Sequence, residues 1–255
     1  MVMSDKAIHV LVIAHPDDES MFFVPTLRAL KASGATVWIL CLTTGDYDGL
    51  GKIRSEEMRQ AGSLLKADNV VVRDTLKDHP TQRWDVEQVQ REIQDALSKL
   101  LSSDGPWERI VLITFDQFGV SGHVNHIDTS HGVCEIAKKG CMSLAPANSS
   151  KTSRRVEIPV EAWTLVSERN IVTKYIPVLS WILLILSLVL TIPTVHNSPD
   201  SQSRTFRLLE PRLNWAAMTT HRSQFVWYRR LFVVFSCYTY VNTLGRIQPK
   251  ESKKD

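Results

Sequence analysis

The sequence predicts an α/β fold with a Rossmann-like layered parallel sheet flanked by helices. Apolar segments of strand length alternate with segments whose apolar residues recur at helical spacing, as in successive βαβ units. Two clusters of histidine and acidic residues directly follow two of these strands, at 14–19 and 116–128. Right-handed crossovers would place both clusters at the carboxyl-terminal edge of a parallel sheet, where α/β proteins bind ligands.

The individual elements follow from this alternation. Strands are expected at Ile8–Ala14, Thr36–Thr43, Asn69–Val72, Arg109–Phe115 and Glu161–Ser167. Helices are expected at Glu19–Ser33, Lys52–Ala67 and 86–101, and a further one follows the loop Asp116–Gly122 and ends at about Lys139. Gly34 ends the first helix, and Asp85 caps the third. The polar stretch 142–155 predicts a surface linker, Asn197–Ser203 a loop, and Arg222–Tyr240 a further helix.

Composition is typical of a globular chain that buries a full core. Of 255 residues, 44% are hydrophobic and 22% charged. Residues 194–255 contain 10 Lys and Arg against 4 Asp and Glu, a net charge of +6, whereas the rest has 20 against 23, a net charge of −3. Such a basic tail suits either an anionic surface or plain solvation. The four cysteines show no CxxC spacing, and the first apolar segment is too short for a signal peptide, so we expect a reduced, cytosolic catalytic body.

The two polar clusters predict a metal site. Two imidazoles and one carboxylate are a usual ligand set for a catalytic zinc that keeps one position open for water. His15, Asp18 and His126 are the candidate ligands, Asp17 is the candidate base, and His123 is a second polar group that faces the substrate. An acidic pair after a strand can also serve only as a helix cap, which is the simpler alternative.

These motifs resemble the PIG-L/LmbE-like zinc deacetylases. The resemblance rests on 14–19 (AHPDDE) and 122–126 (GHVNH), and extends to 22–26, 54–57, 114–116 and 221–231. It implies zinc as the cofactor, with other divalent metals open, held by His15, Asp18 and His126. It further implies that Asp17 is the general base and that His123 assists the developing oxyanion.

The later stretches most resemble the eukaryotic branch of the family. That branch removes the N-acetyl group of N-acetylglucosaminyl-phosphatidylinositol during GPI-anchor biosynthesis, at the cytosolic face of the endoplasmic reticulum. The resemblance therefore implies a metal-dependent amidase whose partners are this lipid and a membrane surface, and not nucleic acid. Arg54 and His221 are candidate substrate-binding residues, although Arg54 could equally be an ordinary surface arginine. Members often have Pro-Asp where this chain has Val124-Asn125, and pairing of Asn125 with His123 would raise the pKa of that histidine less than an aspartate would.

The apolar segment 176–192 predicts contact with a membrane. It is long enough for a thin span or for a buried core helix. A single crossing would separate His221 from the metal site, so a segment embedded in the cytosolic leaflet is favoured. The expected domains are a catalytic part at 1–170, this membrane-associated segment at 171–195, and a basic part at 196–255 that completes the fold.

Three other functions remain as alternatives. A soluble deacetylase of sugar conjugates would share the metal chemistry without needing the apolar segment. A non-catalytic, membrane-tethered binding protein would retain the fold, but it would have no reason to keep Asp17. A nucleotide-binding module is the weakest, because no GxGxxG follows the first strand.

Overall fold

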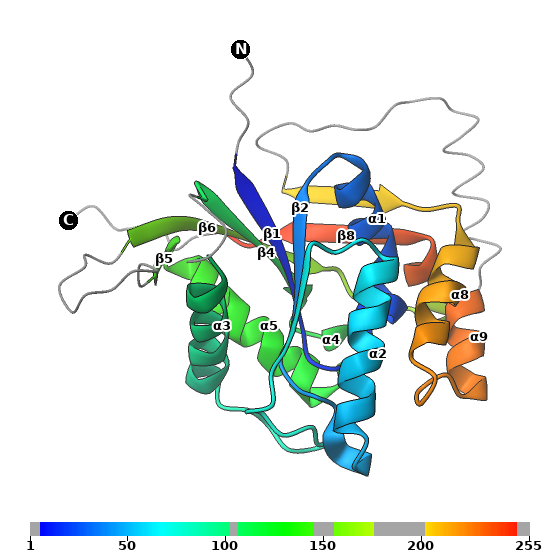
Figure 1. Ribbon diagram of the computed structural model, residues 1–255. Helices are drawn as coiled ribbons and strands as arrows, with labels where there is room; N and C mark the ends of the chain where they lie inside the picture. Colours follow the sequence, from blue (N-terminus) through cyan, green and yellow to red (C-terminus); the bar gives the residue numbers. More distant parts are fainter. Residues whose placement is uncertain (1–5, 102–106, 145–155, 176–201, 249–255) are drawn as a thin grey trace, which may run out of the picture.

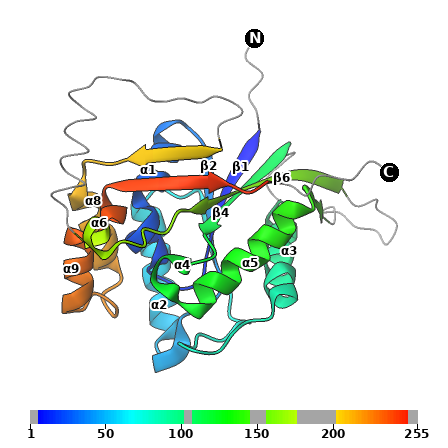
Figure 2. The same ribbon diagram turned by 180° about the vertical axis from the view of Figure 1, so that it is seen from behind.

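A central sheet lies between two layers of helices in the computed structural model, which describes residues 6–101, 107–144, 156–175 and 202–248 (Figure 1). The view from behind shows the same layering, with α3 (Val86–Leu101) and α5 (Val124–Lys138) on one face (Figure 2). The α/β fold with a helix-flanked sheet, predicted from the sequence, is thereby confirmed.

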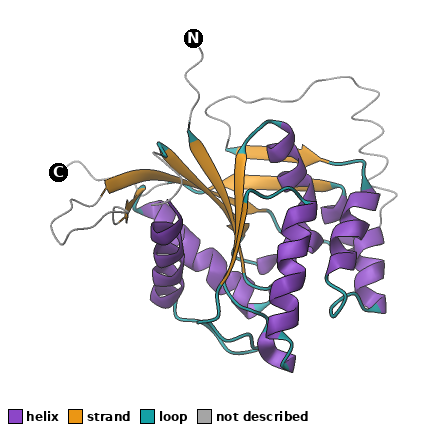
Figure 3. Cartoon of the chain, in the orientation of Figure 1, coloured by secondary structure: helices purple, strands orange, loops and turns teal. Residues whose placement is uncertain are grey.

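The sheet is mixed, with a parallel body and an antiparallel edge (Figure 3). Its strands are β1 (Ala7–Ile13), β2 (Thr36–Cys41), β3 (Asn69–Val72), β4 (Arg109–Phe115), β5 (Cys141–Leu144), β6 (Val156–Leu165), β7 (Ser203–Arg207) and β8 (Val241–Arg246). Their order is β3-β2-β1-β4-β6-β8-β7, and β5 pairs with β6. The first five strands in this order are parallel, as predicted, because helical crossovers separate them. β8 runs antiparallel to both β6 and β7, so the expectation of a wholly parallel sheet is wrong at this edge.

The helices divide between the two faces of the sheet. The remaining ones are α1 (Val24–Ala32), α2 (Gly51–Leu64), α4 (Gly119–Gly122), α6 (Ile171–Tyr175), α8 (Pro211–Thr220) and α9 (Trp227–Phe235). β1 contributes Val10 and Val12 to the core beneath α3 and α5, and Leu11 and Ile13 to the core beneath α1 and α2. Burial of both faces explains why this strand is a continuous apolar run.

The predicted helix at Glu19–Ser33 is interrupted near its start. Residues Glu19–Phe23 form a single π-helical turn, and α1 begins only at Val24. Phe23 leaves helical geometry with φ −120° and ψ 4°, and Pro25 follows in the first turn of α1. Proline has no backbone N–H to donate, so it suits a helix start better than an interior position.

The C-terminal residues add elements that the sequence did not predict. β5 occupies the first residues of the stretch 142–155, which was expected to be a linker. β7, α8 and β8 had no predicted counterpart. The helix expected at Arg222–Tyr240 is shorter, because Ser236 is extended and caps a separate turn at Cys237–Thr239. Asn242 on β8 ties this part to α1, since its Oδ1 accepts from the Thr26 backbone N–H at 3.1 Å and hydroxyl at 2.8 Å.

The predicted membrane-associated segment lies mostly outside the described residues, which resume at 202 after Tyr175. Among the helices that are described, none combines the length and the apolar character needed to cross a bilayer. The predicted division at 170 and 195 stays a prediction, although 202–248 supply two strands of the same sheet.

Candidate active site

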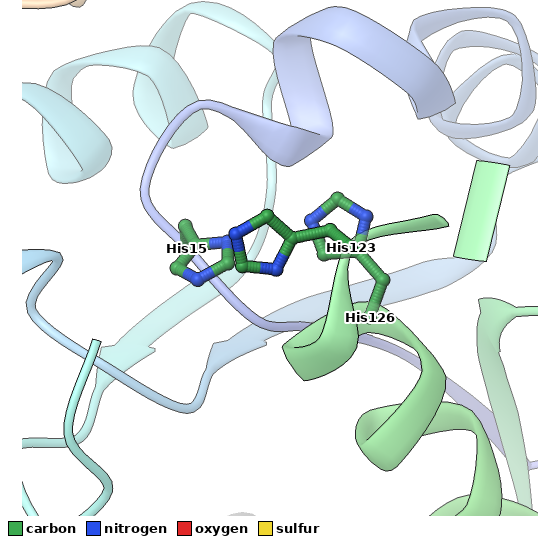
Figure 4. A group of neighbouring side chains, drawn as sticks. All are labelled: His15, His123 and His126. Carbon is green, nitrogen blue, oxygen red and sulfur yellow. The ribbon is translucent and has the colours of Figure 1, made fainter. Parts of the chain in front are cut away.

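Two loops at the carboxyl ends of neighbouring strands bring three imidazoles together. His15 follows β1, whereas His123 and His126 follow β4, which pairs with β1. One ring nitrogen from each histidine lies within 4.8 Å of the others, and the three rings cluster where α5 begins (Figure 4). The ring centroids of His15 and His123 are 4.7 Å apart, and those of His123 and His126 are 5.0 Å apart. The sheet topology therefore produces the convergence that the sequence predicted.

Asp18 joins two of these histidines. Its Oδ1 lies 3.1 Å from Nε2 of His126, and its Oδ2 lies 3.7 Å from Nδ1 of His15. The His15 backbone N–H also donates to Oδ2 at 2.8 Å. Burial alone would raise the pKa of Asp18, but the His126 and His15 imidazoles outweigh burial and hold the pKa well below its usual range. The carboxylate is thus kept in the form that binds a cation.

His126 is held by contacts that leave Nε2 facing Asp18. Its Nδ1 lies 3.0 Å from the carbonyl oxygen of Gly119, a hydrogen bond that assigns the ring proton to Nδ1. The ring stacks on Phe115, with centroids 4.1 Å apart and planes 3° from parallel. A Cβ at Gly119, which has φ +60°, would lie 2.9 Å from Cβ of His126, so glycine permits this close approach.

His15 is oriented by two residues that the sequence analysis did not single out as its partners. Its Nε2 lies 3.2 Å from Oδ1 of Asp78 and 3.2 Å from Oδ1 of Asn125. Burial opposes protonation, but the Asp78 hydrogen bond and the charge of Asp18 raise the pKa of His15. Carboxylate–histidine pairs of this kind commonly fix the ring of a metal-binding histidine. Asp78 lies six residues beyond the end of β3, and no spacing or motif marked it for this role.

His123 caps α5 and lies nearer to the surface than its two neighbours. Its Nδ1 accepts from the Asn125 backbone N–H at 3.2 Å, so the neutral ring has its proton on Nε2. Burial and the imidazoles of His15 and His126 lower the pKa of His123 to about 4. The side chain of Asn125 contacts His15 and not His123, and its amide nitrogen donates to the carbonyl of Gln82 at 3.1 Å.

Asp17 is buried and faces two arginines. Its Oδ2 lies 2.6 Å from Nη1 of Arg229 and 3.8 Å from Nη2 of Arg54. Its φ of 127° is unusual for a residue with a side chain, and such backbone costs on the order of 1–3 kcal/mol. The contact with Arg229 joins positions 212 residues apart in sequence, which no local pattern could have predicted.

Arg54 is buried, at 7% exposure, which excludes the ordinary surface arginine. Its guanidinium donates to the carbonyls of Pro16 at 3.0 Å and Gly45 at 2.8 Å, and it lies 3.4 Å from Asp78. A Cβ at Gly45 would lie 2.4 Å from Cζ of Arg54. Arg54 therefore positions the Asp17 loop, and its predicted contact with substrate stays a prediction.

His221 forms a buried pair with Glu19. Their Nε2 and Oε1 atoms are 2.6 Å apart, and both residues are 0% exposed. Burial disfavours the imidazolium, but the charge and hydrogen bond of Glu19 outweigh it and raise the pKa of His221. This pair joins the first turn after the metal-site loop to the end of α8, so His221 has a positioning role. Its predicted contact with substrate stays a prediction.

The donor set fits a divalent metal ion. Zinc–ligand bonds of about 2.0 Å in a tetrahedral site put ligand atoms roughly 3.3 Å apart, close to the separation of the Asp18 oxygen and the His126 nitrogen. Nitrogen donors combined with a carboxylate suit zinc, and both His15 and His126 have hydrogen-bond partners on their other ring nitrogen. The three-imidazole group offers His123 as a further donor.

Known proteins resemble this chain over nearly its whole length. A family model described as PIG-L: GlcNAc-PI de-N-acetylase matches residues 10–137. A probable N-acetylglucosaminyl-phosphatidylinositol de-N-acetylase of Dictyostelium discoideum is 32% identical over 94% of this chain and 93% of its own length. The N-acetylglucosaminyl-phosphatidylinositol de-N-acetylase of Bos taurus is 31% identical over 92% of this chain and 82% of its own. The solved structure of N,N'-diacetylchitobiose deacetylase from Pyrococcus horikoshii shares the fold, with a TM-score of 0.58 at 15% identity over 95% of this chain and 84% of that one.

Proposed function

The chain belongs to the PIG-L: GlcNAc-PI de-N-acetylase family, and we propose from this membership that it hydrolyses the N-acetyl group of N-acetylglucosaminyl-phosphatidylinositol. The products are acetate and glucosaminyl-phosphatidylinositol, an intermediate of GPI-anchor biosynthesis. The observation that carries the proposal is the convergence of His15, Asp18 and His126 beside the buried Asp17.

The proposed metal ion is zinc, held by His15, Asp18 and His126. Support comes from Asp18, whose two oxygens approach one nitrogen of each histidine. When bound, such an ion polarises an amide carbonyl and lowers the pKa of a coordinated water. His123 is less suited as a ligand, because it is the more exposed imidazole and its Nδ1 is occupied by a backbone N–H.

The chain's own residues have separate roles in this reaction. Asp17 accepts the proton of the attacking water, and its carboxylate is held in place by Arg229 and Arg54. His123, with its proton on Nε2, donates a hydrogen bond to the oxygen of the acetamide as negative charge develops there. The proton held by Asp17 then passes to the leaving amine, which completes the cleavage.

The proposed location is the endoplasmic reticulum membrane, with the catalytic residues facing the cytosol. A phosphatidylinositol substrate keeps its acyl chains in a bilayer, so the enzyme must work at a membrane surface. Residues 176–192 have no charged side chain. The strands before and after them, β6 and β7, belong to one sheet, which supports a segment that enters and leaves a membrane on the same side.

Two adjacent aspartates provide the test. Zinc content of the purified protein and acetate release from N-acetylglucosaminyl-phosphatidylinositol are measured for wild type, Asp17→Asn and Asp18→Asn. Asp17→Asn is expected to keep its metal and to lose about a thousandfold or more in acetate release. Asp18→Asn is expected to lose both metal and activity. A wild type with zinc but without acetate release, or an active Asp17→Asn variant, would contradict the proposal.

A further inference from the structure

Helix α9 has an uncovered apolar face in the part of the chain that the structure describes. Of the fifteen large apolar side chains exposed there, five lie on this nine-residue helix: Trp227, Tyr228, Leu231, Val234 and Phe235. Trp227 is 71% exposed and Leu231 is 50% exposed. Because these residues recur at helical spacing, they form one continuous stripe, which globular proteins normally turn toward their core.

The opposite side of α9 already packs against the protein. Val233 is buried, and the ring of Phe232 lies 5.4 Å from that of Phe22. Arg229 reaches inward to Asp17 at 2.6 Å. The exposed stripe is therefore an additional apolar face, on the side of α9 opposite to the contact between Arg229 and Asp17. Figures 1 and 2 show α8 and α9 together at the side of the molecule away from α3.

Charge indicates what this face contacts. Residues 211–236, from α8 through α9, contain four arginines and no aspartate or glutamate. Of these, Arg222 and Arg230 are exposed. Arg230 precedes Leu231 on α9 and lies at the edge of the apolar stripe, whereas Arg222 lines a hollow with Glu56 and Glu57 of α2. A cationic side chain at the edge of exposed Trp, Tyr and Leu side chains is the pattern of a helix that lies in the interface of an anionic bilayer. A two-fold pairing of two copies through this face would instead bring arginines together.

The course of the chain points the same way. α6 ends at Tyr175, whose ring lies 6.1 Å from that of Phe232 on α9. The uncharged stretch 176–192 begins at the next residue. The most apolar part of the sequence thus follows directly on a residue that packs against α9.

We propose that the outer face of α9, made up of Trp227, Tyr228, Leu231, Val234 and Phe235 with Arg230 at its rim, docks onto an anionic phospholipid leaflet. The inference rests on the proposed function, because a lipid-linked substrate must reach Asp17 from such a leaflet. Docking through α9 places the catalytic loop beside the headgroups, since Arg229 on the inner side of the same helix contacts Asp17.

Flotation with lipid vesicles tests the proposal on the purified full chain. Phosphatidylcholine vesicles with and without phosphatidylserine are compared for wild type, Trp227→Gln, Leu231→Gln and Arg230→Gln. Leu64→Gln is the matched control, since Leu64 is 37% exposed at the far end of α2. We expect Trp227→Gln and Leu231→Gln each to weaken vesicle binding about tenfold and Leu64→Gln to leave it unchanged. Arg230→Gln should lose about fivefold, and only with the anionic vesicles.

A water-soluble N-acetylglucosaminyl-inositol separates docking from catalysis. Acetate release from it should be equal in wild type and in the α9 variants, which also shows that they are folded. Vesicle binding that persists in both Trp227→Gln and Leu231→Gln would overturn the proposal. The proposal would also be overturned if the wild-type protein did not bind vesicles but formed a dimer, and if Leu231→Gln dissociated that dimer. If neither the wild type nor any variant releases acetate but vesicle binding still depends on α9, the proposed function is wrong and the proposed docking surface is supported.

Discussion

Replacement of His221 by leucine separates a positioning role from a substrate-binding role. His221 and Glu19 are both 0% exposed, and their 2.6 Å contact joins the C-terminal residues to the metal-site loop. In His221→Leu the Glu19 carboxylate stays buried and keeps only the Ser20 hydroxyl and the Asp17 backbone N–H as partners. Loss of one partner from a buried pair costs about 3–5 kcal/mol of unfolding free energy.

The expected change is large enough to measure by two methods. For a chain of this size, 1 kcal/mol corresponds to a shift of about 2–4 °C in Tm, so His221→Leu should melt about 6–20 °C lower than wild type. Urea unfolding at fixed zinc concentration provides the free energy itself, because bound metal also stabilises the fold. Addition of Glu19→Gln to His221→Leu removes the unpaired carboxylate and should restore much of the loss.

The kinetic constants decide between the two roles. If His221 only positions the loop, the surviving folded enzyme keeps the KM of wild type. A His221→Leu variant whose free energy of unfolding lies within about 1 kcal/mol of the wild-type value but whose KM is raised would refute this reasoning and favour a contact between His221 and the substrate.

Three further predictions concern stability. Gly45→Ala should destabilise the fold by about 1–3 kcal/mol more than Gly34→Ala in urea unfolding. Both glycines have positive φ, but only at position 45 would a Cβ meet the Arg54 guanidinium. Equal losses of stability in the two variants would contradict this reason. Burial and the charges of Arg204 and Arg109 lower the pKa of His9 from 6.5 to about 4. Between these two pH values the unfolded chain therefore binds a proton at His9 more readily than the folded chain does. Wild type should therefore lose about 2–3 kcal/mol relative to His9→Gln as the pH falls from 7 to 4, and a pH-independent difference would contradict the cause given. Chelation of the metal should lower the Tm of wild type but not that of Asp18→Asn, and the shift should reverse on addition of zinc.

The sequence predicted the parts of the fold that depend on short-range patterns. β3 and β4 have the bounds expected for them, and β1 differs by one residue at each end, because buried parallel strands are apolar runs ended by turn residues. β7 and β8 were missed since their residues, SRTFR and VNTLGR, are polar and include a glycine. A pair of antiparallel strands at the edge of a sheet needs one buried face only, which leaves a weak signal in such short segments.

Prediction of the site was limited in the same way. The clustering of His15 with His126 followed from the shared edge of two strands, which sequence order and crossover handedness determine. The partners of these residues depend on side chains brought in from distant loops. Neither the contact of Asp78 with His15 nor that of Arg229 with Asp17 has a spacing rule behind it.

The ion pair between Asp17 and Arg229 also sets an order of events during synthesis. Nearly all of the reactive groups are present once the ribosome has passed residue 126, yet the carboxylate at 17 meets its arginine only after a further hundred residues have been added. The nascent chain therefore lacks this ion pair at its metal-site loop until residue 229 has been added.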